Sequence, residues 1–307
     1  MEPRAANFLE RGVKKLTRMI ISVFGGGGFI GTHLCERLLD SGHELHVVDV
    51  DFDKLGDLTT HHELTAHELD ITRDDSDDQV ADIVSCTDLV IDLIAYANPQ
   101  QYVDMPIDVV DLNLFENLNI VEHCIDADVP LIQFSTSEVY GKMGGREDPV
   151  FREYESDLTL GPVGKQRWIY SCAKQLLERM VYAYGNRGDL EYTIVRPFNF
   201  IGPKMDYIIE EPDEGTPRVF AGFMSALLYD HPMVLVNGGT NQRVFTHIED
   251  AVDAIELIIE NEDRQFTNEI VNVGAPRNET SMRELAELMR DIYRERSPEG
   301  SIPPVQA

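Results

Sequence analysis

The chain of 307 residues has only four cysteines, and their spacing does not match a metal-binding motif. There is no CxxC pair and no neighbouring histidine that would complete a metal-ligand pattern. The chain is long enough to bury a core without such cross-links. We therefore expect no metal site, and we interpret the four cysteines as buried, reduced residues of an intracellular compartment: Cys35, Cys86, Cys124 and Cys172.

Long apolar runs are also missing from the sequence. No stretch is long enough to cross a bilayer, and residues 1–18 lack the uninterrupted apolar core of a secretion signal. The sequence thus predicts a cytoplasmic protein without membrane contact. Five basic residues in the first 18 suggest a frayed arm or cap: Arg4, Arg11, Lys14, Lys15 and Arg18.

Positive charge is scarce, since 26 basic residues stand against 55 acidic ones and give a net charge of −29. Only seven of the basic residues are lysine. Such a surface repels polyanions, so we expect no nucleic-acid partner. Excess acid with few lysines is typical of halophilic proteins, whose self-repulsion is screened at molar salt. An acidic mesophilic protein is the alternative.

Up to residue 196, short apolar runs alternate with amphipathic stretches, which predicts a Rossmann-type α/β fold with a doubly wound parallel sheet. The expected strands cover residues 19–24, 44–49, 66–70, 88–93, 130–135 and 191–196. The expected helices cover residues 29–40, 107–127 and 168–184, the first ending at Gly42 and the last at Gly185.

Beyond Arg196, prolines and glycines interrupt the pattern, so the elements become shorter. Here we expect helices at 217–229, 249–260 and 281–294 and a strand at 269–273. The predicted organisation is an N-terminal arm at 1–18, an NAD-binding Rossmann domain at 19–196, and a smaller, mainly substrate-binding lobe at 197–307. Such a lobe would close over the strand ends, where these sheets bind ligands.

The first strand runs directly into the glycine-rich sequence GGGGFIG at 25–31, which has the spacing GxxGxxG. Gly25 would permit a tight turn, Gly28 would let the backbone approach a pyrophosphate, and Gly31 would allow close packing of helix on strand. Phe29 and Ile30 lie within the same turn and are candidate cofactor contacts.

Acidic residues end the next two predicted strands. Asp49 can accept hydrogen bonds from the adenosine ribose hydroxyls and would repel a 2′-phosphate, so NAD is the expected cofactor rather than NADP. Asp70 can contact the adenine edge or serve as a capping or surface acid, and both readings are open.

Tyr170 and Lys174 lie four residues apart on a predicted helix, so both side chains share one face. The ammonium group should lower the phenol pKa from about 10 toward neutrality and let Tyr170 act as a general base. The strand before this helix ends in Ser135-Thr136-Ser137-Glu138, which places hydroxyl groups and a carboxylate at the same edge of the sheet.

The glycine turn, the STSEVYG run at 135–141 and the Tyr-Lys pair together resemble extended short-chain dehydrogenases that act on nucleotide sugars. Three further runs are similar to plant UDP-apiose/UDP-xylose synthases and to the decarboxylase domain of the bacterial enzyme of the lipid A aminoarabinose pathway. These runs are KQRWIYSCAKQ at 165–175, RPFNFIGP at 196–203 and QRVFT at 242–246.

The resemblance implies NAD-dependent oxidative decarboxylation of UDP-glucuronic acid to a UDP-4-keto-pentose, UDP-xylose or both, without a metal. It implies that Thr136 and Tyr170 contact the sugar 4-hydroxyl and that Lys174 also holds the nicotinamide ribose. Ser137 and Glu138 would lie beside the sugar carboxylate.

The same resemblance implies a site for the nucleotide and a homodimer. Asn199 and Arg218 would contact the nucleotide, and Arg243 its diphosphate, as expected of arginines that bind anions in an acidic protein. Helices 107–127 and 168–184 would pair with those of a second copy in a four-helix arrangement.

Three alternatives remain open from the residues. A 4,6-dehydratase would carry an aspartate where this chain has Ser137, which argues against that activity. A 4-epimerase does not need a glutamate at position 138, so the presence of Glu138 argues against that one. The third alternative, from another class, is a non-catalytic NAD-binding regulator. It is considered because family members continue into a tail that supplies an arginine to the substrate site, and that arginine has no counterpart in this sequence. Apiose-forming members also have cysteines in place of Ser137 and near Ala97, so the resemblance does not extend to ring contraction to apiose.

Overall fold

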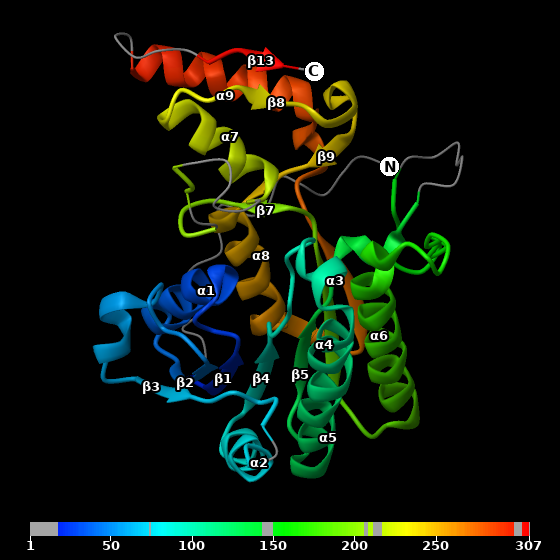
Figure 1. Cartoon of the computed structure of the whole chain (residues 1–307). Helices are drawn as coiled ribbons and strands as arrows, with labels where there is room; N and C mark the ends of the chain where they lie inside the picture. The colour runs from blue at the N-terminus through cyan, green and yellow to red at the C-terminus, as the bar shows by residue number, and fades with distance from the viewer. Residues whose placement is uncertain are drawn as a thin grey trace.

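The computed structural model describes residues 18–73, 75–142, 150–205, 208–210, 217–297 and 303–306. Its centre is a seven-stranded sheet in the order β11-β6-β5-β4-β1-β2-β3, with every pair of neighbours parallel (Figure 1). The strands are β1 Ile20–Phe24, β2 Glu44–Asp49, β3 Leu64–Glu68, β4 Leu89–Asp92, β5 Leu131–Phe134, β6 Tyr192–Pro197 and β11 Glu269–Val273.

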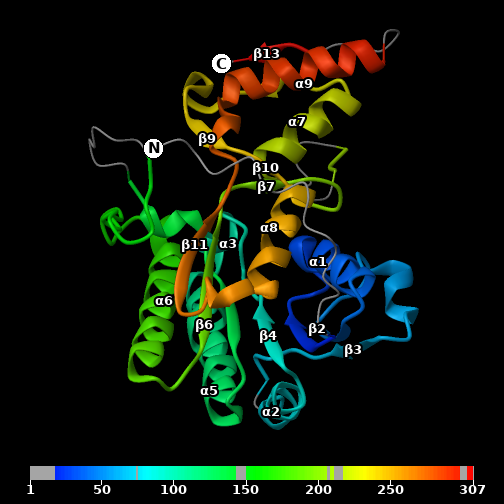
Figure 2. The same ribbon diagram turned by 180° about the vertical axis from the view of Figure 1, so that it is seen from behind.

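Helices cover both faces of this sheet, which confirms the predicted α/β class (Figures 1 and 2). On one face, α1 Phe29–Asp40 and α8 Ile248–Glu260 bury a core with the strands. On the other, α2 Asp77–Ser85, α5 Asn117–Ala127 and α6 Ile169–Arg187 bury a second core. The strand order turns back between β1 and β4, the switch point at which such sheets bind ligands.

The chain beyond β6 enters a smaller lobe, returns to the sheet with α8 and β11, and then rejoins the lobe with α9. The lobe has its own core, between α7 Val219–Leu228 and α9 Met282–Arg296. Because β11 and α8 also come from this part of the chain, residues 19–196 lack one strand of the main sheet. This part of the chain also forms three separate two-stranded sheets. They are β7 Phe200–Ile201 with β10 Thr246–His247, β9 Gln242–Val244 with β12 Glu279–Ser281, and β8 Met233–Val234 with β13 Val305–Gln306.

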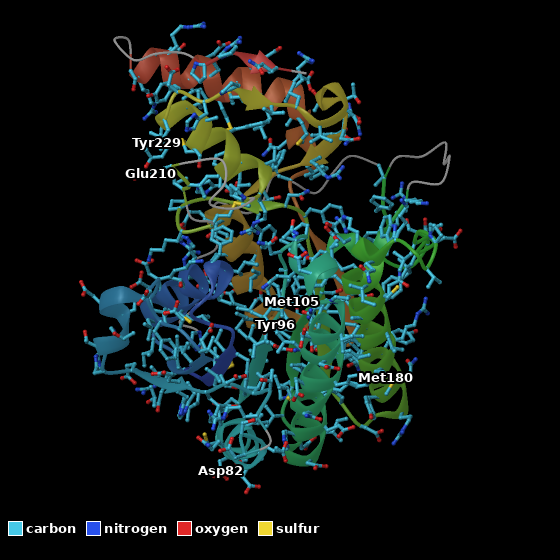
Figure 3. The ribbon with its side chains drawn as sticks, in the orientation of Figure 1. Asp82, Tyr96, Met105, Met180, Glu210 and Tyr229 are labelled. Atoms are coloured by element: carbon cyan, nitrogen blue, oxygen red, sulfur yellow. The ribbon has the colours of Figure 1, made fainter. Side chains whose placement is uncertain are left out.

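Side chains at the end of α7 hold the described residues of the preceding loop. Tyr229 lies beside Glu210 at the edge of the smaller lobe (Figure 3), with its hydroxyl 3.4 Å from the carboxylate. His231 Nε2 contacts the Glu210 carbonyl at 2.8 Å.

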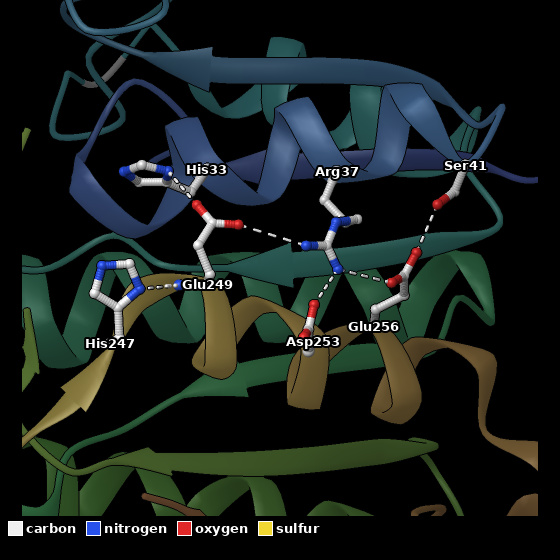
Figure 4. A network of polar contacts seen from close by, with 7 residues as sticks. All are labelled: His33, Arg37, Ser41, His247, Glu249, Asp253 and Glu256. Atoms are coloured by element: carbon white, nitrogen blue, oxygen red, sulfur yellow. Dashed lines mark hydrogen bonds and ion pairs between the residues drawn. The ribbon is translucent and has the colours of Figure 1, made fainter. Parts of the chain in front are cut away.

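A charged cluster joins α1 to α8 (Figure 4). Arg37 of α1 donates to Glu256 at 3.1 Å and also pairs with Asp253, while Ser41 donates to the other oxygen of Glu256 at 2.5 Å. The helix that follows the glycine turn is thereby fixed to the helix that lies between α7 and α9 in the chain.

Two helices differ from the expectation. The helix expected at 107–127 is α4 Pro106–Val110 and α5 joined by a π-helical turn at Asp111–Glu116. The helix α6 does not end at Gly185 but continues to Gly188, whose φ is +80°. Gly185 lies inside the helix and is a glycine for a packing reason. A Cβ there would approach the ring of Tyr192 to 2.2 Å.

Two shorter helices, α2 and α3 Gln101–Asp104, were not predicted. The third strand was expected at 66–70 and lies two residues earlier. Cys35 and Cys124 are buried as expected, but Cys86 and Cys172 are exposed. Of the basic arm, residues 1–17 lie outside the described part, and Arg18 is held by Glu44 at 2.9 Å. Among the described residues, no helix is long and apolar enough to cross a membrane.

Candidate active site

A cavity of about 840 Å³ lies at the carboxyl ends of the strands, between the sheet and the smaller lobe. Residues far apart in the sequence meet there, from the start of α1 to the smaller lobe. Ten of the predicted site residues line it: Phe29, Ile30, Thr136, Ser137, Glu138, Tyr170, Lys174, Asn199, Arg218 and Arg243.

The glycine turn has no room for side chains. Gly25 has a φ of +78°, and a Cβ there would lie 3.0 Å from the backbone of Leu93. A Cβ on Gly31 would lie 2.5 Å from the Cα of Gly26, so the start of α1 packs directly on the turn. Gly28 is the N-cap residue of α1, where backbone N–H groups and the helix dipole favour a phosphate.

Asp49 is held at the end of β2 against this turn. Its Oδ2 accepts a hydrogen bond from Gly27 N at 2.9 Å, and its Oδ1 accepts one from Val50 N at 2.8 Å. Burial raises the pKa of its carboxyl, while these hydrogen bonds oppose the shift. The turn and its neighbouring acid fit the phosphate and ribose parts of a dinucleotide.

Asp70 makes the contacts of a capping acid. Its Oδ1 accepts hydrogen bonds from the backbone N and the hydroxyl of Thr72, at 3.0 and 2.7 Å. Its side chain is exposed, and it is not among the residues that line the cavity. A contact between Asp70 and adenine stays a prediction.

Lys174 is buried in α6, with three acceptors around its ammonium group. Its Nζ donates to Asn117 Oδ1 at 2.9 Å, to the Phe134 carbonyl at 3.2 Å and to the Ile94 carbonyl at 3.4 Å. Burial lowers the pKa of Lys174 to about 8, and the negative charges of Asp92 and Glu178 oppose that shift.

Tyr170 lies one turn earlier on α6 and is also buried, with its ring stacked on Tyr102 at 4.7 Å between centroids. Burial raises the pKa of its phenol, and the charge of Glu138 raises it further, although a hydrogen bond with Thr136 and the charge of Arg218 oppose this. The expected lowering of the phenol pKa is therefore wrong for this structure. The physical reason is desolvation, together with an ammonium group whose three hydrogen bonds go to other acceptors.

The residues after β5 are arranged by a short turn. Thr136 caps the 3-10 helix Ser137–Tyr140, and its hydroxyl oxygen accepts a hydrogen bond from Glu138 N at 3.1 Å. Ser137 lines the cavity beside it. Ser135 also lines the cavity, and its buried Oγ has no hydrogen-bond partner among the described residues. Ser135 was not predicted as a site residue, and its free hydroxyl fits a polar ligand at this edge.

Arg167 was not predicted as a site residue, and it contacts Glu138 directly. Its guanidinium donates to both oxygens of that carboxylate, at 2.7 and 2.8 Å. It also lies over the rings of Tyr102 and Trp168, 5.8 and 5.6 Å from their centroids. Its place three residues before Tyr170 was the available signal. Tyr102 gave none, because it falls where no element was expected.

The smaller lobe contributes the other polar residues predicted for the site. Asn199 has a φ of +41° and donates from its side chain to the Val244 carbonyl at 2.9 Å. Arg218, at the start of α7, donates to the Met205 carbonyl at 2.9 Å. Arg243, on β9, donates to the Gln242 carbonyl at 2.8 Å and is exposed.

A parallel sheet of this order, with a glycine turn after its first strand and a Tyr-Lys helix at its switch point, defines an oxidoreductase of the extended short-chain dehydrogenase class. The comparisons with known proteins agree. The chain belongs to the NAD dependent epimerase/dehydratase family, whose model matches residues 21–274. Its cofactor is NAD.

Two curated relatives are similar along nearly the whole chain. UDP-D-apiose/UDP-D-xylose synthase of Oryza sativa subsp. japonica is 41% identical over 94% of this chain and 77% of its own length. UDP-D-apiose/UDP-D-xylose synthase 1 of Arabidopsis thaliana is 42% identical over 97% of this chain and 81% of its own. The crystal structure of PbgP3 protein from Burkholderia pseudomallei is 38% identical, has a TM-score of 0.82, and is matched over 91% of this chain and 82% of its own.

Proposed function

We propose that the protein is a lyase that oxidises UDP-glucuronic acid at C4 with NAD and releases its carboxylate as carbon dioxide. The product is a UDP-4-keto-pentose, UDP-xylose or both. The observation that carries the proposal is the Glu138–Arg167 pair, which lies in the same cavity as the buried Tyr170 and Lys174. The similarity to UDP-D-apiose/UDP-D-xylose synthases supports it.

The first step is the oxidation of the C4 hydroxyl. Tyr170 takes the hydroxyl proton as the phenolate, and Thr136, which lines the same cavity, orients the oxygen. Because burial raises the phenol pKa in the ligand-free chain, this step requires the positive charge of the bound oxidised cofactor to lower it. Bound NAD supplies the acceptor for the hydride from C4. Lys174 lies one helical turn behind the phenol, where its ammonium group can hold the nicotinamide ribose.

The second step is the loss of the carboxylate on C5. With a ketone at C4 the substrate is a β-keto acid, so the C5–carboxylate bond can break with its electrons delocalised onto the ketone oxygen. Ser137 can hold one carboxylate oxygen and so orient the breaking bond, an effect that can supply several kcal/mol. Glu138 lies next to it, with its charge compensated by Arg167.

The nucleotide would lie along the smaller lobe. Arg218 and Arg243 both line the cavity there, and guanidinium groups bind diphosphates through paired hydrogen bonds. Asn199 lines the same wall.

Carboxyl-labelled UDP-glucuronic acid tests this proposal. The protein with NAD should release labelled carbon dioxide, and NMR should detect a UDP-pentose or its 4-keto form. Tyr170→Phe is the matched control and should release none above background. Turnover without labelled carbon dioxide would contradict decarboxylation and favour a 4-epimerase, whereas no reaction at all would favour a regulator.

We further propose a homodimer. Supporting this, the helices expected to pair carry exposed apolar side chains: Ile107, Phe115, Leu176 and Tyr182. Burying such a surface against a second copy would be favourable. Light scattering coupled to gel filtration tests this, and a mass of one chain at micromolar concentration would contradict it.

The cellular setting is also a proposal. We place the protein in the cytoplasm, a compartment consistent with four unpaired cysteines. The net charge of −29 and the shortage of lysine support a salt-adapted host.

A further inference from the structure

The side chain of Lys174 is oriented by two backbone carbonyls as well as by Asn117. These carbonyls belong to Ile94 and Phe134, which follow or end the neighbouring strands β4 and β5. What fixes these two peptide groups therefore also fixes the position of the ammonium group in the cavity.

Asp92, the last residue of β4, is hydrogen-bonded to both places. Its side chain is fully buried, with a relative exposure of 0%. Its Oδ1 accepts from Ile94 N at 2.9 Å, and its Oδ2 accepts from Gln133 Nε2 at 2.7 Å. The same Gln133 Nε2 lies 3.4 Å from the Phe134 carbonyl. Two routes thus lead from one carboxylate to Lys174, through the Ile94 residue and through Gln133 with Phe134.

Asp92 is a buried acid whose charge acts on Lys174. Burial raises the pKa of the Asp92 carboxyl, while Lys174 and the donors Gln133 and Ile94 oppose that shift. The two donors require an acceptor, which a carboxylate provides. Glu178 also faces Lys174 but is held by Arg196, and Cys124 on α5 faces Asp92 with its thiol pKa raised by burial.

We propose that Asp92 is a positioning residue of the active site, which holds the two carbonyls around Lys174 and keeps that side chain a buried ammonium ion. Asp92 does not touch the cavity itself, because it is not among the residues that line it. This role of Asp92 bears on the Tyr-Lys site and on NAD binding, whichever sugar is the substrate.

The titration of Lys174 in the ligand-free chain tests the inference. With 13C-labelled lysine, NMR follows the seven ε-carbons, and the Lys174 signal is identified by its absence in Lys174→Arg. We expect a midpoint near pH 8 for the unchanged protein. Asp92→Asn keeps the side-chain volume but removes the charge, so its midpoint should fall by about one pH unit or more.

Asp88→Asn is the matched control. Asp88 lies just before the other end of β4, is exposed, and accepts a hydrogen bond from Ile20 N at 2.8 Å. Its variant should leave the Lys174 midpoint unchanged. An unchanged midpoint in folded Asp92→Asn would overturn the inference, whereas a parallel fall in the pH at which NADH binding is lost would support it.

A measurement on the unchanged protein covers the case in which Asp92→Asn does not fold. The side-chain carboxyl carbon of Asp92, assigned through its backbone, should show the shift of an ionised carboxylate at pH 7. It should then respond with the midpoint of Lys174. A carboxyl that is protonated at pH 7, or that shows no response as Lys174 loses its proton, would overturn the inference as well.

Discussion

The buried ion pair between Glu178 and Arg196 allows the clearest prediction of stability. Glu178 follows Lys174 by one turn of α6, and Arg196 lies on β6, so the pair fixes the helix that carries Tyr170 and Lys174 to the sheet. Two hydrogen bonds join the side chains, at 2.9 and 2.6 Å, and the side chains are only 5% and 3% exposed.

Glu178→Gln should destabilise the protein by about 3–5 kcal/mol, because it leaves the Arg196 charge buried without its counter-charge. Arg196 keeps a neutral partner, the Tyr140 hydroxyl at 2.8 Å, which cannot balance that charge. Urea unfolding can be followed by the fluorescence of the single tryptophan, Trp168. In a separate thermal unfolding experiment, the melting temperature should fall by roughly 6–10 °C, at about 2 °C per kcal/mol for a chain of this size.

Two controls make this result specific. Glu36→Gln removes an exposed carboxylate from α1 and should change the free energy of unfolding by less than about 0.5 kcal/mol. The double variant Glu178→Leu with Arg196→Met removes both charges and should cost less than the sum of the single changes. A loss below about 1 kcal/mol for Glu178→Gln would refute the idea that this pair fixes α6 to the sheet.

Three further predictions concern the cofactor, the base and the surface. Because Asp49 lies against the glycine turn, NAD should bind more tightly than NADP in calorimetry, and the reverse order would contradict that role. Tyr170→Phe should abolish turnover and leave NAD affinity nearly unchanged, since the phenol acts on the substrate proton. Turnover above about one tenth of the original would remove Tyr170 as the base. With a net charge of −29, the melting temperature should rise markedly from low to molar KCl, whereas a flat or falling curve would favour a mesophilic protein.

Local patterns predicted the regular part of the fold. The strand at 44–49 and the helix at 29–40 have the predicted bounds, because alternation, helical periodicity and the glycine turn are encoded by neighbouring residues. Gly185 shows the limit of such reasoning. It resembles a helix end, but it is needed inside α6 for contact with Tyr192, which no local pattern reveals.

The sequence by itself determined the class of fold, the glycine turn and the Tyr-Lys helix, since each depends on spacing along a few turns of chain. It also pointed to Thr136, Ser137 and Glu138, because the end of a parallel strand is where such sheets bind ligands. Only the tertiary structure decided how charge is distributed in the site. Glu138 meets Arg167 across 29 positions and Asp92 meets Gln133 across 41, and the pKa of Tyr170 is raised by burial. Desolvation and contacts between distant segments exist only once the chain is folded, so the sequence could name Tyr170 and Lys174 as a candidate catalytic pair but could not predict their electrostatics.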